Sequence, residues 1–359
     1  MHICLSCVEF FGRGIQGGFG RATRFLGREL VRRGVRVSVV VPRRGQLQEG
    51  MVDGMRVLGF DSFRPWSAVR AFRACQADIY HAQDTSLGIP LARLAMPRGK
   101  QVVTFRDPME AADWRLETAM SGKSRLSYLT YRYFIDNPWV DHAVRRADAC
   151  YCAANFLIPK VVRKYGFARP PGFLPTPVDV PASVEKAARP TVLFLGRWDP
   201  RKRPERFIEL ARRLPAVDFI AVGGSSDPTR DAWLRGLAAT VPNLQLPGVI
   251  DQFATDQLSR VLSASWVLVN TSPREGLPNA FLEAAAHGCA LLSLTDPDGF
   301  TSRFGAVAEE ATLEERLSWL LADGHWRDRG AAAREFIAEV FATPRALDAH
   351  LAVYERILA

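Results

Sequence analysis

Long hydrophobic runs are absent from the sequence. Among its 359 residues, no apolar stretch approaches the roughly 20 residues that cross a bilayer. The opening residues, MHICLSCVE, also lack the basic start and long apolar core of a secretory signal. The chain contains no short internal repeat and no low-complexity tract. We therefore expect a cytoplasmic protein and exclude one that spans a membrane.

Cysteine is scarce, and its spacing does not suit a metal site. The six cysteines include one C-x-x-C pair, Cys4 and Cys7. A second pair with zinc-site spacing is missing, because Cys150 and Cys152 are only two residues apart. The first pair also falls in an apolar stretch typical of a buried strand. We interpret the cysteines as core residues of a protein in a reducing compartment.

The composition is that of an ordinary globular protein. Hydrophobic residues make up 48% of the chain and charged residues 24%. These fractions exclude a disordered chain, a collagen-like fibre and a small disulfide-stapled scaffold. At about 150 residues per domain, the length predicts two domains, each large enough to bury a core.

Negative charge is scarce in the first half of the chain. Residues 1–180 carry 27 Lys and Arg against 15 Asp and Glu, whereas residues 181–359 carry 20 against 23. The first half therefore accounts for the whole net charge of +9. A basic half attracts anions such as nucleic acid, acidic lipid headgroups or a phosphorylated substrate. Solubility alone is the alternative explanation, and the composition does not decide between them.

The spacing of apolar residues predicts two successive α/β domains. Residues 2–8 are typical of a strand, a glycine-rich loop follows, residues 19–31 show helical periodicity, and residues 35–41 form a second strand. A strand–helix–strand unit of this length implies a parallel sheet. Further on, residues 114–146 show a helical pattern with many aromatics. The alternation of strands and helices restarts at residues 191–195.

A proline-rich segment separates the two patterns. Residues 168–190 hold six prolines, too many for a helix or a central strand. We therefore predict an N-terminal Rossmann-like domain (1–172), a linker (173–190), a C-terminal Rossmann-like domain (191–340) and a C-terminal helix (341–359). We expect the two domains to face each other across a cleft, with ligands at the carboxyl ends of their strands.

The most informative motif is SPREGLPNAFLEA, residues 272–284. It opens a helix that we expect to begin at Pro278 or Asn279, because Pro suits a first turn and Asn caps well. The N–H groups of such a helix start suit a phosphate, and Gly276 allows close approach of the backbone. Glu275 and Glu283 then flank the anion with carboxylates that accept hydrogen bonds from hydroxyls. A loop charge and a helix-dipole partner are the structural alternative.

A basic loop follows the strand at 191–195. Its sequence, GRWDPRKRP at 196–204, contains four basic residues, of which Arg197 and Lys202 are spaced to hold a diphosphate from two sides. A solvated charge run is the alternative, but the position at a strand's carboxyl end favours function. The glycines at 14–20 match a dinucleotide fingerprint only loosely, since the next strand ends in arginines instead of an acid. We expect that loop to close over a ligand.

Together these motifs resemble the GT-B glycosyltransferases of the large retaining family four, whose mark is E-x7-E. The resemblance covers nearly the whole chain, through GGFGRATRFLGRELVRRGVRVSVVV, GRWDPRKRPERFIELA, VGG at 222–224 and REGLPNAFLEAAAHGCALLS. The last segment is the most specific, because it combines Glu275 and Glu283 with Gly-Leu-Pro-Asn and a following strand. The implied fold is α/β with GT-B architecture, two Rossmann-like domains. The resemblance makes residues 1–172 the acceptor domain and residues 191–340 the nucleotide-sugar donor domain, with the helix at 341–359 returning to the first domain.

The resemblance implies a retaining hexosyltransferase that moves a sugar from a UDP- or GDP-sugar to a glycan, lipid-linked or small-molecule acceptor, in cell-envelope polysaccharide or glycoconjugate synthesis. The enzyme mainly stabilises charge on the leaving diphosphate, and neither a metal nor another cofactor is expected. The implied catalytic residues are Glu275, Arg197, Lys202 and Asp107. The implied donor-binding residues are Gly17, Gly18, Arg197, Lys202, Val249 (beside the base), Glu275, Gly276, Leu277, Pro278, Asn279 and Glu283 (on the ribose).

Some positions depart from the family pattern. Where Thr-x-His-Asp is common, Arg106 replaces the His that tends to lie near the donor sugar, so the donor's identity stays open. Asp107 is a candidate acceptor or sugar ligand, with a helix cap as the alternative. The linker reads TPVD at 176–179 instead of Asn-Gly-Val-Asp. His81 is a candidate to face the cleft, and His287 is expected to close a helix, where positive charge is favourable.

Arginines and aromatics alternate in parts of the first half. Examples are Arg64, Arg70 and Arg73 among Phe63, Trp66 and Phe72, and residues 123–139, where Lys123, Arg125 and Arg132 lie among five aromatics. This pattern suits peripheral contact with an anionic membrane, where a lipid-linked acceptor would lie. Packing of the aromatics in the core is the alternative, and we favour it.

Two other functions are alternatives to a transferase. The first is a GT-B-like sugar-nucleotide epimerase or hydrolase, which the spacing of the two glutamates disfavours. The second is a nucleic-acid-binding protein that uses the basic half, for which the sequence contains no recognised binding module. We therefore expect a nucleotide sugar and an acceptor as partners, and no nucleic acid.

Overall fold

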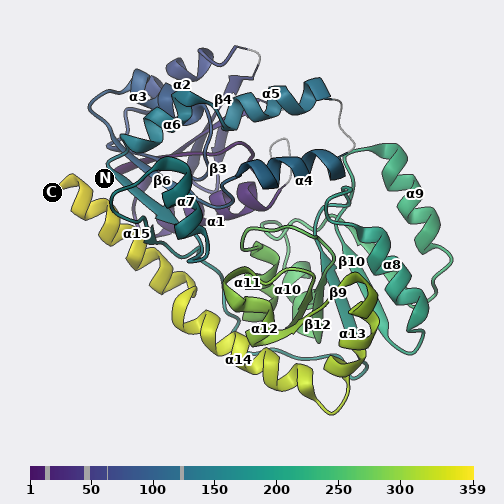
Figure 1. The fold of residues 1–359 in the computed structure, drawn as a ribbon. Helices are drawn as coiled ribbons and strands as arrows, with labels where there is room; N and C mark the ends of the chain where they lie inside the picture. Colours follow the sequence, from purple (N-terminus) through teal and green to yellow (C-terminus); the bar gives the residue numbers. More distant parts are fainter. Residues whose placement is uncertain (13–16, 44–48, 63, 122–124) are drawn as a thin grey trace. The chain divides into compact units, whose positions relative to one another are not determined.

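The computed structural model describes residues 1–12, 17–43, 49–62, 64–121 and 125–359 (Figure 1). The chain divides into two compact α/β units. The first contains nearly all residues up to Pro177 and, in addition, Thr343–Ala359, whereas the second consists mainly of Val178–Ala342. Phe63 and Lys123, which belong to the predicted aromatic–basic segments, lie outside the described residues.

The first unit is built on a sheet in the order β3-β4-β2-β1-β5-β6-β7-β8. The strands are β1 His2–Ser6, β2 Arg36–Arg43, β3 Gly50–Val52, β4 Met55–Asp61, β5 Ile79–Ala82, β6 Lys100–Phe105, β7 Ala149–Cys152 and β8 Gly172–Phe173. The predicted parallel pair is present as β1 and β2, in the register Ile3↔Val37. A short antiparallel hairpin at the edge, β3 with β4, was not predicted.

Helices lie in the connections between these strands. They are α1 Gly18–Arg32, α2 Ser67–Cys75, α3 Gly88–Ala95, α4 Ala111–Ser121, α5 Arg125–Ile135, α6 Pro138–Arg145, α7 Leu157–Tyr165 and α15 Thr343–Leu358. The helical segment predicted at 114–146 is thus divided among α4, α5 and α6. Asn137 explains the start of α6, because its side chain accepts hydrogen bonds from the N–H groups of Trp139 and Val140 while Pro138 occupies the first turn.

The second unit has a sheet in the order β11-β10-β9-β12-β13-β14, whose paired strands are all parallel. The strands are β9 Thr191–Leu195, β10 Asp218–Val222, β11 Leu244–Gly248, β12 Val267–Asn270, β13 Ala290–Ser293 and β14 Gly305–Val307. The helices are α8 Pro204–Arg213, α9 Pro228–Ala238, α10 Gln257–Ala264, α11 Asn279–Ala286, α12 Phe300–Phe304, α13 Leu313–Leu321 and α14 His325–Val340, with 3-10 turns η1 Pro297–Gly299 and η2 Glu310–Thr312.

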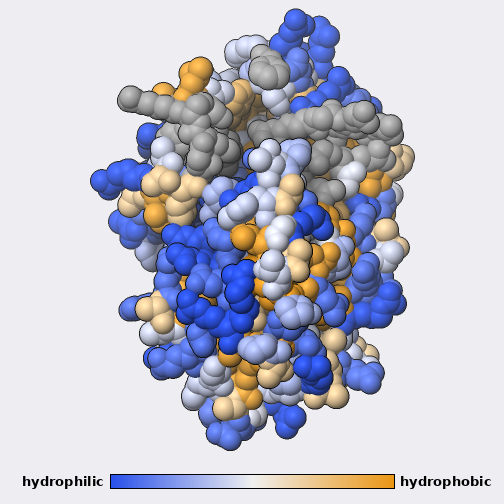
Figure 2. All heavy atoms as spheres, turned by 90° about the vertical axis from the view of Figure 1, so that its right-hand side faces the viewer, coloured by the Kyte–Doolittle hydropathy of each residue, from blue (hydrophilic) through white to orange (hydrophobic). Residues whose placement is uncertain are grey.

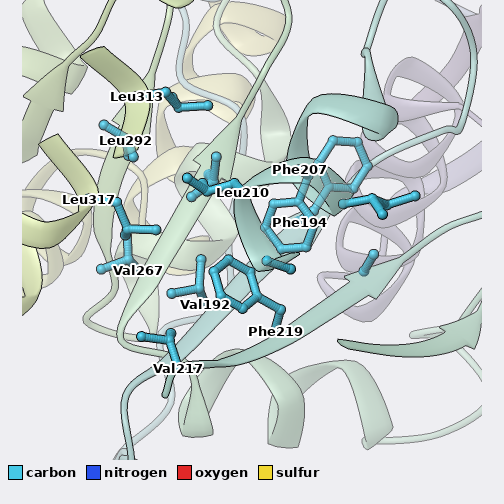
Figure 3. Close-up of a cluster of buried hydrophobic side chains, with 14 of the residues drawn as sticks. Val192, Phe194, Phe207, Leu210, Val217, Phe219, Val267, Leu292, Leu313 and Leu317 are labelled. Atoms are coloured by element: carbon cyan, nitrogen blue, oxygen red, sulfur yellow. The ribbon is translucent and has the colours of Figure 1, made fainter. Parts of the chain in front are cut away.

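A buried aromatic cluster joins sheet and helix in the second unit. Figure 3 shows Phe194 of β9, Phe207 of α8 and Phe219 of β10 close together among aliphatic side chains. The ring centroids of Phe207 lie 5.5 Å from Phe194 and 5.3 Å from Phe219. Each ring of this size buries enough apolar area to contribute about 2–3 kcal/mol. This core holds the ends of β9 and β10 in place beneath the loops that follow them.

The predicted linker is not a free segment. Up to Pro177 the chain is bound to the first unit, where the N–H of Leu174 donates to the carbonyl of Cys152. From Val178 it is bound to the second unit, where the N–H of Val178 donates to the carbonyl of Phe341. The prolines at 168–190 therefore mark an irregular chain that is packed on each unit in turn, because its backbone groups find partners there.

The helices of the described residues are all too short or too polar to cross a bilayer. On the face drawn in Figure 2, hydrophilic and hydrophobic residues are interspersed. The cysteines are free thiols, and Cys4 contacts Cys75 across 3.7 Å between the sulfur atoms instead of pairing with Cys7. The interpretation of the C-x-x-C pair as core residues agrees with the burial of both of its thiols.

Candidate functional site

Two loops of the second unit lie side by side at the carboxyl ends of β9 and β12. These strands are neighbours in the sheet, so their ends meet at one edge. Thr271, after β12, donates a hydrogen bond to the carbonyl oxygens of Lys202 (2.6 Å) and Arg203 (3.0 Å). Ser272 donates to the carbonyl of Arg201 at 3.1 Å. The loop after β12 thus fixes the backbone of the basic loop after β9.

Lys202 and Glu275 are in contact across these loops. The Lys202 ammonium forms an ion pair with the Glu275 carboxylate, which also accepts a hydrogen bond from the Asn270 side chain at 3.2 Å. Both side chains are only partly exposed. An ammonium carries three donors, so Lys202 keeps N–H groups for an anion while Glu275 orients it. The structure therefore brings together two residues that the sequence predicted from separate motifs.

Asp199 organises the cations of the basic loop. Its carboxylate accepts a hydrogen bond from the Arg201 guanidinium at 2.9 Å and lies 3.4 Å from that of Arg197. Burial alone would raise the pKa of Asp199, but Arg201 and Arg197 outweigh it, and the pKa lies below its ordinary value. Sequence reasoning assigned Asp199 no role. The pattern that could have revealed it is an acid inside a run of basic residues, which indicates an ion pair within the loop.

Glycines allow the ends of β9, β10 and β11 to approach closely. Gly223 has φ of +147°, and a Cβ atom there would lie 1.9 Å from the carbonyl oxygen of Gly196. Gly248, at the end of β11, has φ of +82°. Val249 follows it with 54% of its surface exposed, and a Cβ atom at Gly224 would lie 3.1 Å from its side chain. Val249 thus presents an apolar surface at the same sheet edge.

The helix of the E-x7-E motif begins at Asn279, one of its two predicted starts. Asn279 is the first residue of α11, and Pro278 occupies the N-cap position with extended backbone angles and no side-chain cap. Asn279 therefore does not cap the helix. Gly276 and Leu277 lie directly before this helix start. Gly276 is buried and Leu277 is half-buried. The backbone N–H groups of a helix start suit a bound anion.

Glu283 lies one turn into α11 and is half-buried. Its backbone carbonyl accepts a hydrogen bond from Nδ1 of His287 at 2.7 Å, and Nε2 of the same ring lies 2.9 Å from the Ser259 hydroxyl. Burial lowers the pKa of His287. His287 is the C-cap residue of α11, so the prediction that it closes this helix is confirmed, while burial disfavours the positive charge expected there. The His287 ring fixes the helix that carries Glu283.

A carboxylate lies at the start of α1 in the first unit. Gly17 is the N-cap of α1 and Gly18 its first residue, while residues 13–16 lie outside the described residues. Glu9 accepts a hydrogen bond from the N–H of Gly20 at 3.1 Å, and a Cβ atom at Gly17 would lie 2.2 Å from its oxygens. Sequence reasoning missed Glu9. Its carboxylate lies at this helix start in the structure.

Arg106 is buried in the first unit. Its guanidinium donates to the Thr176 hydroxyl at 2.8 Å and to the Gln83 side-chain carbonyl at 2.6 Å. Burial lowers its pKa from the usual value. Arg106 therefore joins the end of β6 to the segment before Val178, whereas the next residue, Asp107, is only half-buried. The side chain at the position where the family commonly has His is therefore held by hydrogen bonds to two other segments of the first unit.

Asp84 is a further buried group that sequence reasoning missed. It follows β5, and its carboxyl group accepts a hydrogen bond from the N–H of Thr85 at 2.8 Å. Burial, reinforced by the charges of Asp107 and Glu9, raises its pKa to about 8. The signal in the sequence was HAQD at 81–84, polar residues placed directly at the end of an apolar strand.

His81 does not face an open surface. Its ring is fully buried, with Nδ1 2.7 Å from the Tyr354 hydroxyl and Nε2 2.7 Å from that of Thr104. Burial holds its pKa well below the usual value. The expectation that His81 is a candidate for a cleft is therefore corrected: it is a neutral core residue that links β5 and β6 to α15.

Among the residues with described positions, no three His, Cys, Asp or Glu side chains are grouped to hold a metal ion. The chemistry of the second-unit edge is that of cations, glycine backbone and two carboxylates. That set can bind a diphosphate and hydroxyl groups.

Family models match both units of the chain. The model of Glycosyltransferase Family 4 matches residues 16–181, and that of glycosyl transferases group 1 matches residues 189–323. No curated protein sequence is similar enough to count as a match. The two models together define the class, an enzyme that transfers sugars. The chain belongs to the family 4 type of GT-B glycosyltransferases.

Solved structures share this fold over the whole chain. Sucrose-phosphate synthase from Thermosynechococcus elongatus has a TM-score of 0.76 at 17% identity, covering 99% of this chain and 98% of its own. HepE from Anabaena, solved with UDP and glucose, has 0.71 at 13%, covering 99% and 100%. The catalytic domain of starch synthase IV from Arabidopsis thaliana, bound to ADP and acarbose, has 0.69 at 13%, covering 99% of each. The predicted GT-B fold, with two Rossmann-like units, is confirmed.

Proposed function

We propose that this glycosyltransferase is a retaining hexosyltransferase. It takes the sugar from a nucleotide-sugar donor bound by the second unit and passes it to a glycan, a lipid-linked or a small-molecule acceptor, in cell-envelope polysaccharide or glycoconjugate synthesis. The observation that supports this best is the contact of Lys202 with Glu275, where the basic loop meets the loop that leads into α11. It places a cation, a carboxylate and a helix start at one edge of the sheet.

The cations of the basic loop suit the diphosphate of the donor. Arg197 and Lys202 stand on the same loop, and the guanidinium of Arg197 is 40% exposed. Cleavage of the bond between sugar and diphosphate builds negative charge on the leaving group. Preorganised donors aimed at such charge are worth about 3–4 kcal/mol each in transition-state stabilisation. The N–H groups at the start of α11 add to this without any metal ion.

Hydroxyl groups of the donor suit the two glutamates. In this proposal Glu283 accepts hydrogen bonds from the ribose and Glu275 from the sugar, and Val249 lies beside the base. HepE was solved with UDP and glucose and starch synthase IV with ADP, so relatives of this fold differ in the base that they bind. The identity of the base in this chain is therefore a matter for direct measurement.

Retention follows from attack on the face that the diphosphate leaves. In that mechanism a phosphate oxygen takes the proton of the acceptor hydroxyl, and no side chain needs to act as a base. Asp107, at the end of β6, is proposed as an acceptor or sugar ligand. With an identified donor and acceptor, NMR of the product should show the anomeric configuration of the donor. An inverted product would contradict retention, and donor rearrangement without an acceptor would favour an epimerase.

A thermal-shift panel tests the donor site. UDP, GDP, ADP and their common sugars are added, with a chelator present, to the unaltered protein, Glu283→Ala and Glu339→Ala, an exposed glutamate of α14. At about 100 times Kd, a ligand adds about 2.7 kcal/mol of stability, which is a shift of several degrees. We expect one base to give it, Glu283→Ala to lose it and Glu339→Ala to keep it. No shift with any nucleotide would contradict the proposal.

A further inference from the structure

Two tryptophans of the first unit are in contact and exposed. The rings of Trp66, before α2, and Trp139, in the first turn of α6, have centroids 5.7 Å apart. Trp66 is 63% and Trp139 40% exposed. The expectation that the aromatics pack in the core is therefore wrong for this pair. Large apolar side chains that touch each other at the surface mark an interaction site more often than scattered ones do.

The tryptophans stand on a layer of helices with positive charge. Helix α3 packs against both α2 and α6, and the three lie together in Figure 1. Helices α2 and α3 contain no acidic residue. The arginines exposed on this layer or at its ends are Arg64, Arg70, Arg73, Arg98, Arg145 and Arg146. The acid Asp148 accepts hydrogen bonds from Arg93 and from the N–H of Gln101. The layer therefore presents cations.

Helix α5 adds an apolar stripe to this surface. Leu126, Leu129 and Tyr133 follow the spacing i, i+3, i+7 of one helix face, and Leu126 is 75% exposed. The end of α5 is joined to the helix layer, because the N–H of Leu87 donates to the carbonyl of Phe134 at 2.9 Å. The Asn137 side chain donates to the backbone carbonyl of Tyr133 at 2.6 Å.

We propose that this aromatic–basic surface, made of Trp66, Trp139, the stripe of α5 and the surrounding arginines, docks the protein on an anionic lipid bilayer. Tryptophan rings sit at the headgroup level of membranes, leucines gain by entering the acyl boundary, and arginines pair with acidic headgroups. A bilayer buries the leucines of α5, whereas a nucleic-acid backbone has no apolar surface that could bury them. Two copies of the surface would bring arginines against arginines.

Docking in this way involves only the first unit. The starts of α2 and α3 follow strands of a parallel sheet and therefore lie at the carboxyl edge, the edge that also carries Asp84 and Asp107. An acceptor carried on a lipid would reach that edge from the bilayer, and this last step rests on the proposed function. The surface itself does not depend on the donor site of the second unit.

Vesicle flotation of the full chain tests the docking surface. The vesicles are phosphatidylcholine alone, or phosphatidylcholine and phosphatidylglycerol in equal parts. We expect binding only to the anionic vesicles, and weakening by salt. The double variants Trp66→Ala/Trp139→Ala and Arg70→Glu/Arg146→Glu should each lower the partition coefficient about tenfold or more.

Matched variants of the second unit serve as controls. Trp233, which is 47% exposed, is the control for the two tryptophans. The exposed Arg316 is the control for the arginines. Trp233→Ala and Arg316→Glu should bind vesicles as the unaltered protein does, and all variants should keep the nucleotide-induced thermal shift. Equal binding to neutral vesicles, equal loss in the controls, or binding to RNA but not to vesicles would overturn the proposal. So would self-association that the surface variants abolish without any vesicle binding.

Discussion

The carboxyl group of Asp84 holds a proton that an exposed aspartate would lose. Burial raises its pKa to about 8, whereas an aspartate of an unfolded chain has a pKa of about 3.9. Between these values the folded state binds more protons than the unfolded state, so the free energy of unfolding falls as the pH rises. The stabilising contribution is complete below the lower value and is lost as the pH passes the upper one.

Asp84→Asn should remove this dependence, because the amide keeps the size of the side chain and does not ionise. Its melting temperature relative to the unaltered protein should rise steadily between about pH 4 and about pH 8 and level off above that. Thermal unfolding across this range measures the difference. Asp328→Asn, at an exposed position of α14, is the control and should show no such trend. A difference between Asp84→Asn and the unaltered protein that stays constant with pH would contradict the burial argument.

Arg106 shows where sequence reasoning stops at the residue scale. The replacement of the expected His was visible in the motif, but the partners of the guanidinium, Gln83 and Thr176, lie on other segments. A buried guanidinium without partners would be costly, so the hydrogen bonds are what make its burial tolerable. Sequence shows that a side chain has changed, while burial and partners depend on which segments the fold brings beside it.

Gly223 sets the geometry of the β10 end, and its neighbour Gly224 is a matched control. Gly223→Ala would place a Cβ atom against the Gly196 carbonyl at a φ of +147°, whereas at Gly224 the nearest atom belongs to the Val249 side chain, 3.1 Å away. We expect Gly223→Ala to cost about 2 kcal/mol or more in the free energy of unfolding, and Gly224→Ala clearly less. Denaturant unfolding measures both, and equal costs would contradict this assignment.

Elements with a strong periodic pattern were predictable, and those without one were not. The apolar run at Thr191–Leu195 is a strand with the predicted bounds, and α1 spans the predicted periodicity. The β3 strand has only three residues and pairs across a tight turn at Asp53 and Gly54, too short a segment for any period to show. The start of α6 depends on capping by Asn137, which periodicity does not detect.

The final helix completes the core of the first unit although it follows the second in sequence. Tyr354 of α15 is fully buried and packs in one cluster with Leu5 and Val39 of the first sheet, and its hydroxyl contacts His81. Tyr354→Ala should cost about 3–5 kcal/mol, as large aromatic deletions do. Leu358→Ala, at a 41% exposed position of the same helix, should cost little. Denaturant unfolding compares them, and similar costs would contradict a core role for α15.

The candidate site was predictable in its parts and not in its assembly. Lys202 and Glu275 are 73 positions apart, and each was predicted from its own motif at the end of a strand. Their contact depends on the strand order, which places β9 beside β12, and no local pattern contains that order. Glu9 was missed because its partner, the N–H of Gly20, lies in another segment. Asp199 was missed although its partners, Arg197 and Arg201, belong to the same basic loop. The binding roles of all these residues stay predictions.

The most direct measurement is the affinity of the second unit's edge for a diphosphate. Titration calorimetry compares the nucleoside diphosphate selected by the panel with the same nucleoside, on the unaltered protein, Lys202→Ala and Arg212→Ala, the exposed far end of α8. A hydrogen bond to a charged group is worth about 1.5–3 kcal/mol. Lys202→Ala should therefore weaken diphosphate binding about tenfold or more and leave the nucleoside unaffected, while Arg212→Ala changes neither. Diphosphate binding unchanged in Lys202→Ala would contradict the donor site.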